Sequence, residues 1–289
     1  MKLRGQVAIV TGGGRGIGEA IALAFAREGA RLIIASRTQA ELDQVAAQIR
    51  ELGGEVQAIR ADVANRDDVT RLIEATLRAY GQIDILVNAA GVYGPIGPMW
   101  GIEVDEWIQT MQINLVGTFM CCHAVVPQMI ERRLGKIVNF SGGGATAPLP
   151  RFTAYGVSKT AIVRLTETLA EEVKEYNVQV NAVAPGAVDT RLQDQVIAAG
   201  ERAGDLLTRI RKLREAGEGG VPRELPAELV MFLASDASDG LTGKLIAAPY
   251  DGWQSWDADR FAELMSAPWF TLRRIDPFTL KPFIATAER

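Results

Sequence analysis

A glycine-rich loop near the start of the chain offers the first chemistry. The segment VAIVTGGGRGIGEAIALAF begins as an apolar strand at 7–11, turns at glycines and continues as a helix. Gly12, Gly16 and Gly18 are spaced to allow a tight turn, close approach to a pyrophosphate and close helix–strand packing. The helix start presents unpaired N–H groups and the positive dipole end to phosphates. The motif therefore predicts a dinucleotide site; the alternative is a glycine turn that binds nothing.

The end of the second apolar run bears on which dinucleotide binds. A carboxylate about twenty positions after the glycine loop would hold the adenosine ribose hydroxyl and favour NAD. The run ends instead in Ser36 and Arg37, and Arg15 lies within the glycine loop. An arginine is always charged and can pair with a 2′-phosphate through two N–H groups. The sequence predicts NADP(H) over NAD(H), unless both arginines are only solvated surface residues.

Hydrophobic patterning predicts the elements that position these residues. Nearly continuous apolar runs alternate with longer amphipathic segments, as in sheets buried on both faces. The predicted strands are 7–11, 30–36, 55–62, 83–90, 136–141, 178–185 and 243–249. The predicted helices are 16–28, 38–52, 66–80, 103–133, 153–176 and 226–234. The alternation indicates an α/β fold, a parallel sheet with helices on both faces.

Two segments depart from this alternation. Residues 187–225 are polar and helical and end in EAGEGG, so we expect a flap that helps to shape a pocket. Residues 250–289 are rich in aromatic side chains, so we expect them to pack rather than to be disordered. Two roles stay open for this tail, a packing element in an oligomer or a lid over the pocket.

Further motifs follow in a fixed order. Asn88-Ala-Ala-Gly91 ends the fourth strand, Asn114 lies in INLVGTF, Tyr155 and Lys159 form YxxxK, and Pro185-Gly186 precedes Thr190. With the glycine loop, these motifs resemble the classical short-chain dehydrogenase/reductase family over about residues 5–250. The resemblance implies a single doubly wound Rossmann-type domain with a seven-stranded parallel sheet. We assign it to 1–252, with 253–289 as a C-terminal extension.

The resemblance also implies an activity, hydride transfer between NADP(H) and a carbonyl or secondary alcohol, with Tyr155 as acid–base. Lys159 lies one helical turn further on the same face. Its ammonium would lower the phenol pKa, which is about 10 in water, and hold the nicotinamide ribose. Asn114 would support a water-linked proton path behind Lys159.

The same resemblance implies the cofactor contacts. Asp62 and Val63 would border the adenine, Asn88 would line the groove, and Val188 and Thr190 would face the carboxamide. The full implied set is Gly12, Gly14, Arg15, Gly16, Ile17, Gly18, Ser36, Arg37, Asp62, Val63, Asn88, Ala89, Gly91, Tyr155, Lys159, Pro185, Gly186, Val188 and Thr190.

One catalytic position departs from the family pattern. Members usually carry a serine about thirteen residues before the tyrosine, and here that position is Gly142, with Ser141 one residue earlier. The glycines that follow can let the backbone bring Ser141 into place, so Ser141 is the fourth catalytic candidate. Alternatively, Ser141 only ends the strand, and a backbone N–H or Thr146 holds the substrate oxygen.

Composition restricts partners and location. The chain has 289 residues, a net charge of -4 and no basic run, which argues against nucleic acid. No apolar run reaches the length of a membrane span. Cys121 and Cys122 are adjacent, a poor disulfide framework, so we expect a reduced, cytoplasmic protein. His123, the single histidine, is expected to be structural, and no metal site is predicted. The resemblance implies a homodimer or homotetramer.

Two rival functions remain open. A regulatory or scaffold protein that binds a dinucleotide without catalysis is favoured by the displaced serine and opposed by the Tyr155/Lys159 pair. An NAD-linked sugar-nucleotide epimerase or dehydratase would usually have a longer substrate domain. The fold does not specify the substrate, which we expect to be a small carbonyl or alcohol.

Overall fold

The sheet has seven strands, all of them parallel to their neighbours. A computed structural model describes residues 1–215 and 220–275 of the chain. The strands are β1 (Val7–Thr11), β2 (Arg31–Ser36), β3 (Glu55–Arg60), β4 (Ile85–Asn88), β5 (Gly135–Phe140), β6 (Val178–Ala184) and β7 (Leu245–Ala247). They lie in the order β3-β2-β1-β4-β5-β6-β7. The order reverses between β1 and β4, the switch point beyond whose carboxyl ends ligands bind in such sheets. The predicted fold class is confirmed.

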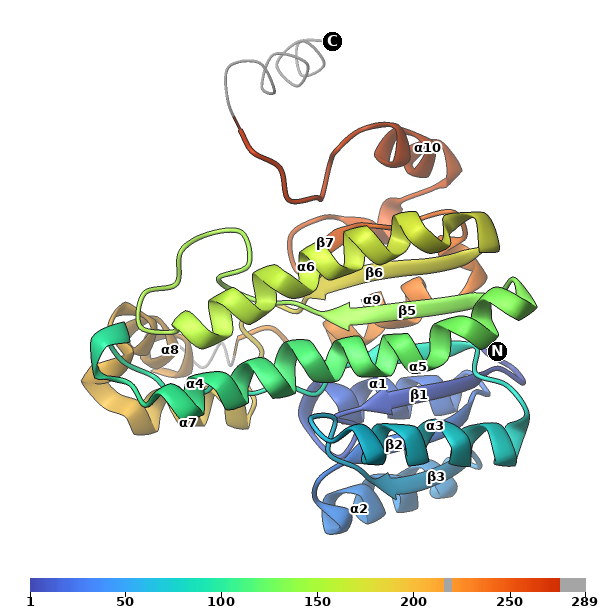
Figure 1. Cartoon of the computed structure of the whole chain (residues 1–289), viewed down its shortest axis with the longest axis horizontal. Helices are drawn as coiled ribbons and strands as arrows, with labels where there is room; N and C mark the ends of the chain where they lie inside the picture. The colour runs from blue at the N-terminus through green and yellow to red at the C-terminus, as the bar shows by residue number, and fades with distance from the viewer. Residues whose placement is uncertain (216–219, 276–289) are drawn as a thin grey trace.

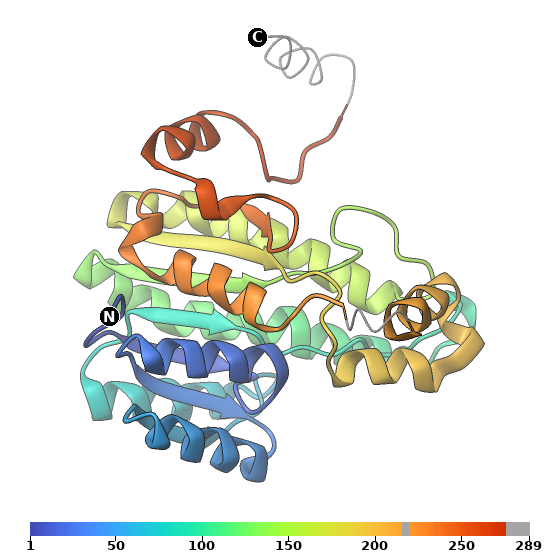
Figure 2. The same ribbon diagram turned by 180° about the vertical axis from the view of Figure 1, so that it is seen from behind.

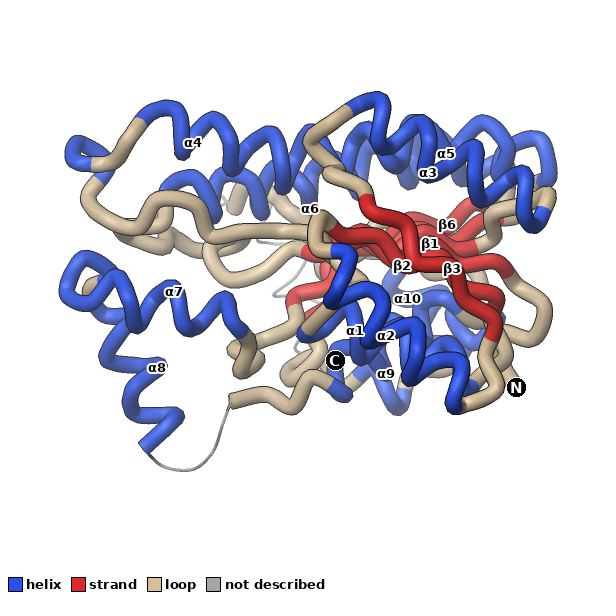
Figure 3. The backbone as a smooth tube through the Cα atoms, turned by 90° about the horizontal axis from the view of Figure 1, so that it is seen from below, coloured by secondary structure: helices blue, strands red, loops and turns tan. Residues whose placement is uncertain are grey.

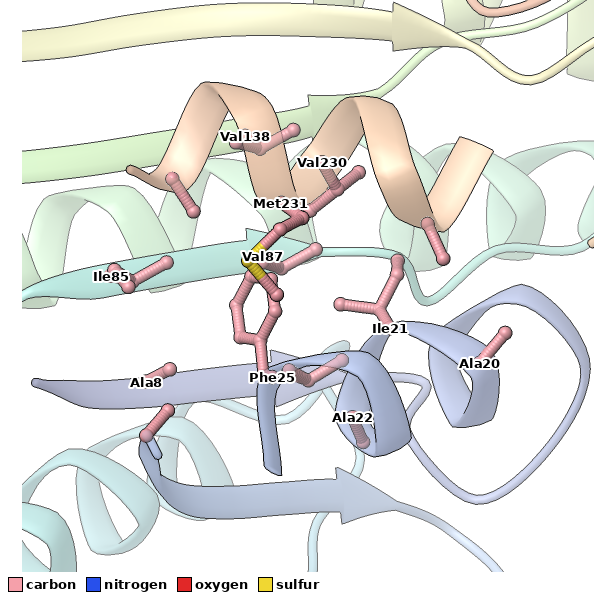
Figure 4. Packing of buried hydrophobic residues seen from close by; sticks show 14 of the residues in the cluster. Ala8, Ala20, Ile21, Ala22, Phe25, Ile85, Val87, Val138, Val230 and Met231 are labelled. Carbon is pink, nitrogen blue, oxygen red and sulfur yellow. The ribbon is translucent and has the colours of Figure 1, made fainter. Parts of the chain in front are cut away.

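Helices cover both faces of the sheet (Figures 1 and 2). One layer holds α1 (Gly16–Arg27), α2 (Gln39–Glu51) and α9 (Glu224–Ala234). The other holds α3 (Arg66–Tyr80), α5 (Gly117–Arg132) and α6 (Thr153–Val173), and Figure 3 shows the two layers edge-on. Figure 4 shows the hydrophobic core between the sheet and the layer of α1 and α9, around Phe25 of α1, Met231 of α9 and Val87 of β4.

Local signals explain where the elements begin and end. All five residues of β1 are buried, which accounts for its unbroken apolar run. Helix α3 begins after Asn65, whose side chain accepts hydrogen bonds from Asp67 N and Asp68 N, and ends at Gly81 with φ +73°. The predicted bounds of 7–11 and 66–80 are matched. The predictions 178–185 and 243–249 run longer than β6 and β7, because β6 ends at Ala184 and β7 pairs with it only over Leu245–Ala247.

The predicted helix at 103–133 is interrupted. Helix α4 (Val104–Met111) passes through a π-helical turn at Gln112–Val116 into α5. Extra residues in such turns are frequent at functional sites. By length and composition alone, Val104–Arg132 has what a membrane-crossing helix needs, and a core helix of a soluble protein meets the same test.

The residues at 121–123 divide between core and surface. Cys121 and Cys122 are buried, and burial raises the pKa of Cys121 to about 12, so this thiol packs as a small apolar group. His123 is exposed, with its ring 5.7 Å from that of Phe119. His123 is therefore not a buried structural residue, because the cysteines before it take the positions that face the core.

The described part of the C-terminal tail packs beside β7. Leu245 N on this edge strand donates to Phe270 O at 2.7 Å. Trp253 is buried, and its Nε1 donates to Ala248 O at 3.0 Å. Helix α10 (Ala258–Ser266) adds the fully buried Leu264 to the same core. Residues 250–275 therefore pack on the sheet edge, while 276–289 lie outside the described residues.

Candidate active site

A groove of about 520 Å³ lies at the carboxyl ends of the strands. It brings together segments from the glycine loop to the flap, far apart in the sequence. Among the sequence-predicted residues, it is lined by Gly12, Gly14, Arg15, Gly16, Ile17, Gly18, Ser36, Arg37, Asp62, Val63, Ala89, Gly91, Ser141, Tyr155, Lys159, Pro185 and Thr190. The structure thus collects most of the predicted set on one surface.

The glycine loop has no room for side chains at Gly12 and Gly18. A Cβ on Gly18 would lie 2.2 Å from Gly12 O, so the start of α1 packs directly on the loop. Gly12 has φ +69°, and a Cβ there would lie 2.8 Å from Ala90 N. The first N–H groups of α1 have no partner within the helix and face the groove. These residues fit the pyrophosphate of a dinucleotide.

An acidic residue absent from the sequence prediction, Glu41, lines the groove beside two arginines. Glu41 Oε1 is 3.3 Å from Arg15 Nη1 and 2.7 Å from Arg191 Nη1. All three residues line the groove, and Arg37 lines it too. Glu41 lies five residues after Ser36, in the first turn of α2. The signal available in the sequence was a carboxylate at the start of the helix that follows the second strand.

Tyr155 and Lys159 are buried together on the first turns of α6. Their exposed fractions are 7% and 4%. Lys159 Nζ donates to Phe140 O at 2.8 Å and lies 5.6 Å from the centre of the Tyr155 ring. Burial raises the pKa of the Tyr155 phenol and lowers that of Lys159 to about 8. At neutral pH the pair is therefore a protonated phenol beside an ammonium group. The expectation that Lys159 lowers the phenol pKa is not met, because burial raises it.

Asn114 belongs to the scaffold directly behind this pair. It is fully buried in the π-helical turn. Its Oδ1 accepts from Val92 N at 2.9 Å, and its Nδ2 donates to Val92 O and to Ser158 Oγ, each at 2.9 Å. A Cβ on Gly91 would lie 3.4 Å from both Asn114 Oδ1 and Lys159 Nζ. Asn114 thus borders Lys159 while clamping the loop after β4.

Ser141 is turned away from the tyrosine hydroxyl. Its Oγ donates to Lys159 O at 3.1 Å. Gly142 faces Tyr155 instead, and a Cβ on Gly142 would lie 2.4 Å from Tyr155 Oη. The phenol therefore occupies space that a side chain at 142 would need. The structure does not bring the Ser141 hydroxyl to the reacting group, because consecutive residues at a strand end point to opposite sides. Thr146 is exposed.

Three predicted cofactor contacts lie outside the groove lining. Asn88 is buried beneath it, and its Nδ2 donates to Asn139 Oδ1 at 2.9 Å. Gly186, with φ +83°, packs against Val221 and Pro249. Val188 is buried and forms a bridge with Val221. The expectation that Asn88 lines the groove is wrong, because its side chain extends into the sheet layer.

The flap covers the substrate side of Tyr155. It consists of α7 (Arg191–Ala199) and α8 (Asp205–Glu215). Its buried side chains Val196, Leu207 and Ile210 pack in one cluster with Tyr155, Phe152 and Ile96. The Tyr93 ring lies 4.6 Å from that of Tyr155, edge to face. Burial raises the pKa of Tyr93 to about 12. Tyr93 was missed, although it follows the Asn88–Gly91 motif by two residues.

Strand order, glycine loop and the buried tyrosine–lysine pair define a Rossmann-type dinucleotide-binding enzyme. Residues 6–200 match the family model described as short chain dehydrogenase. The chain is 35% identical over 246 residues to the 3-oxoacyl-acyl-carrier-protein reductase FabG of Thermotoga maritima, covering 85% of this chain and 97% of that one. It is 38% identical to D-threitol dehydrogenase of Mycolicibacterium smegmatis, covering 84% and 90%.

A solved structure agrees. That of NAD⁺-bound xylitol dehydrogenase superposes with a TM-score of 0.79 and 31% identity, covering 86% of this chain and 98% of that one. The chain belongs to the short-chain dehydrogenase/reductase family. It is an oxidoreductase of this family, whose members use NAD(P) and act on small molecules. Within residues 1–215 and 220–275, no three His, Cys, Asp or Glu side chains gather into a metal site.

Proposed function

We propose that this enzyme transfers a hydride between NADP(H) and a carbonyl or secondary alcohol carbon, with Tyr155 as the acid–base. The observation that carries the proposal is the burial of Tyr155 beside Lys159 at the inner end of the dinucleotide groove. The bound nicotinamide supplies or accepts the hydride. The protein's own residues bind and orient the two reactants and move the proton.

Tyr155 suits proton donation to a carbonyl oxygen as hydride arrives at the adjacent carbon. Its raised pKa keeps the phenol protonated at neutral pH. The negative charge that develops on the phenol oxygen is stabilised by the Lys159 ammonium. Asn114 holds the loop and Ser158 around this pair, in support of the proton path. With Gly142 at the family serine position, Tyr155 provides the proton without a serine hydroxyl beside it.

The preference for NADP(H) rests on two arginines at the adenosine end. Arg37 follows β2 directly, and Arg15 lies in the glycine loop, so both border the groove where a 2′-phosphate would project. Guanidinium groups match phosphate oxygens in geometry and charge. The NAD⁺-bound xylitol dehydrogenase shows that family members also use the other cofactor.

The surroundings of Tyr155 support a small, largely apolar substrate. Tyr93, Phe152 and the buried side of the flap enclose the phenol.

Exposed apolar residues on α5 and α6, Phe119 and Val157, support a homodimer or homotetramer. The buried, unpaired Cys121 and Cys122 are consistent with a reducing cytoplasmic location.

A cofactor titration followed by turnover assays tests the proposal. The purified protein should bind NADPH at least about tenfold more tightly than NADH by fluorescence, and Arg37→Gln should reduce that ratio. Tyr155→Phe should abolish reduction of a carbonyl panel and leave NADPH binding unchanged. Turnover by Tyr155→Phe would refute the acid–base assignment. Cofactor binding without turnover on any substrate would favour the regulatory alternative, which the position of the Ser141 hydroxyl, turned away from Tyr155, supports.

A further inference from the structure

We propose that Glu41 sets the discrimination between NADP(H) and NAD(H), with Arg191 of the flap controlling how strongly it does so. This inference rests on the proposed function, because it takes the groove as a dinucleotide site. Glu41 competes with a 2′-phosphate for Arg15, and Arg191 draws Glu41 away from that competition. Neither residue belongs to the sequence-predicted cofactor set.

The geometry places one carboxylate oxygen between two cations. Glu41 Oε1 contacts Arg15 Nη1 at 3.3 Å and Arg191 Nη1 at 2.7 Å. The Glu41 side chain is 19% exposed, whereas those of Arg15 and Arg191 are 51% and 68% exposed. The carboxylate is therefore the fixed member, and the two arginines reach it from the glycine loop and from the start of α7.

Charge decides the direction of the effect. A 2′-phosphate at the adenosine ribose brings about two negative charges close to Glu41, and like charges at such distances repel even near a protein surface. It also needs Arg15, which Glu41 already contacts. NAD(H) carries a hydroxyl at this position, which can donate a hydrogen bond to a carboxylate. Glu41 thus disfavours NADP(H) and favours NAD(H), so both effects change the ratio of affinities in the same sense.

Other charges around the ribose end do not neutralise Glu41. Arg37 lines the groove and forms no ion pair with Glu41 in the described part of the chain. Arg223 is paired with Glu19 at 3.0 Å. Asp62 Oδ1 accepts from Ala64 N at 2.9 Å. Arg15 and Arg191 are the cations in contact with Glu41 within the described part of the chain.

Arg191 gives the arrangement a second control point. It is the first residue of α7 and lies 150 residues from Glu41 in the chain. Its ion pair with Glu41 is shorter than that of Arg15, at 2.7 Å against 3.3 Å, so we infer that Arg191 interacts more strongly with the carboxylate. Without Arg191, Glu41 pairs more fully with Arg15 and competes more strongly with the phosphate. The flap thereby affects the adenosine end of the groove as well as the substrate end.

Four variants of the full-length protein test this arrangement by titration with NADPH and NADH. Glu41→Gln keeps the size and removes the charge, so the affinity ratio should shift about tenfold towards NADPH. Arg191→Gln should shift it in the opposite direction. In the double variant the effect of Arg191→Gln should vanish. Glu51→Gln, which removes the same charge from the last residue of α2, is the control and should leave the ratio unchanged.

Each result bears on one part of the proposal. An unchanged ratio in Glu41→Gln, with Glu51→Gln also unchanged, would overturn the role of Glu41. A loss of NADPH affinity from Arg191→Gln that persists in the double variant would show that Arg191 contacts the cofactor directly, and would overturn its indirect role. Wild-type preference for NADH would refute the proposed cofactor but not this inference, since the ratio would still move with Glu41. Binding of neither cofactor would refute both.

Discussion

Burial shifts the pKa values of the neighbouring Tyr155 and Lys159 side chains in opposite directions. It raises the pKa of the Tyr155 phenol and lowers that of Lys159 to about 8, because each neutral form is favoured away from water. Within residues 1–215 and 220–275, Lys159 Nζ donates to the carbonyl oxygen of Phe140 and has no carboxylate within ion-pair distance. Its charge is therefore lost at a pH where an exposed lysine would still be protonated.

This shift predicts the pH dependence of carbonyl reduction. Lys159 is an ammonium below about pH 8 and neutral above it, and only the ammonium stabilises the charge that develops on Tyr155. The value of kcat/KM for reduction should be constant from about pH 6 to 7.5 and fall by up to about tenfold per unit above 8. Stopped-flow rates at saturating NADPH measure it. A rate that stays level to pH 9.5 would contradict the assignment.

Gly142 makes a second prediction at the scale of one residue. A Cβ there would lie 2.4 Å from Tyr155 Oη, so Gly142→Ser must displace the phenol. Misplacement of a reacting group by about 1 Å can cost up to about a hundredfold in rate. We expect kcat to fall at least about tenfold, with NADPH binding unchanged. Gly143→Ala, where a Cβ meets nothing within 4 Å, is the matched control. A faster Gly142→Ser enzyme would show instead that a serine can be restored here.

At the scale of elements, the π-helical turn between α4 and α5 positions the loop after β4. It presents Asn114, whose side chain makes three hydrogen bonds, two to the backbone of Val92 and one to Ser158 Oγ. Gly91 is thereby held between Asn114 and Lys159. The turn joins three elements, the end of β4, α5 and the first turns of α6, around the reacting pair.

Asn114→Ala should therefore affect both stability and rate. Leaving Val92 N and O without partners in a partly buried place should lower the free energy of unfolding by about 1 kcal/mol or more. The rate kcat should fall at least about tenfold, because the Lys159 surroundings loosen. Urea unfolding and steady-state kinetics measure the two effects. Ser158→Ala removes only one of the three hydrogen bonds of Asn114, so it should lower stability and kcat less than Asn114→Ala does. Normal kcat in a destabilised Asn114→Ala would reduce Asn114 to a purely structural residue.

At the scale of the whole molecule, the described part of the C-terminal extension packs on the edge of the sheet. Its backbone joins the β7 edge through Phe270 O, and Lys244 Nζ donates to Ala267 O and Trp269 O. Trp253 and Leu264 belong to the same core as α1 and α9. An edge strand otherwise presents unpaired backbone groups to other chains. The extension therefore protects this edge and adds to the core.

Trp253→Ala tests whether the extension unfolds with the rest. Removing a buried tryptophan typically costs about 3 kcal/mol or more, so the single cooperative transition should shift to lower urea. Tyr250→Ala, at a side chain 78% exposed, should change stability by less than about 0.5 kcal/mol. A Trp253→Ala protein as stable as Tyr250→Ala would mean that the extension adds nothing to the core.

The sequence by itself determined the elements and most of the groove. Apolar runs separated by glycine turns specify buried strands and helix ends, because these depend on neighbours close in the chain. The spacing of Tyr155 and Lys159 likewise places them on one face of a helix. The order of motifs then placed their segments at one edge of the sheet.

Only the tertiary structure decided where individual side chains point. Ser141 turns to Lys159 O, Asn88 lies beneath the groove and His123 faces outward. Glu41 meets Arg191 across 150 residues. Such contacts depend on the register of strands and on packing against distant segments. A one-residue change in register reverses the side of the sheet that a strand residue faces. Local sequence patterns do not specify which distant side chain or backbone group it contacts on that side.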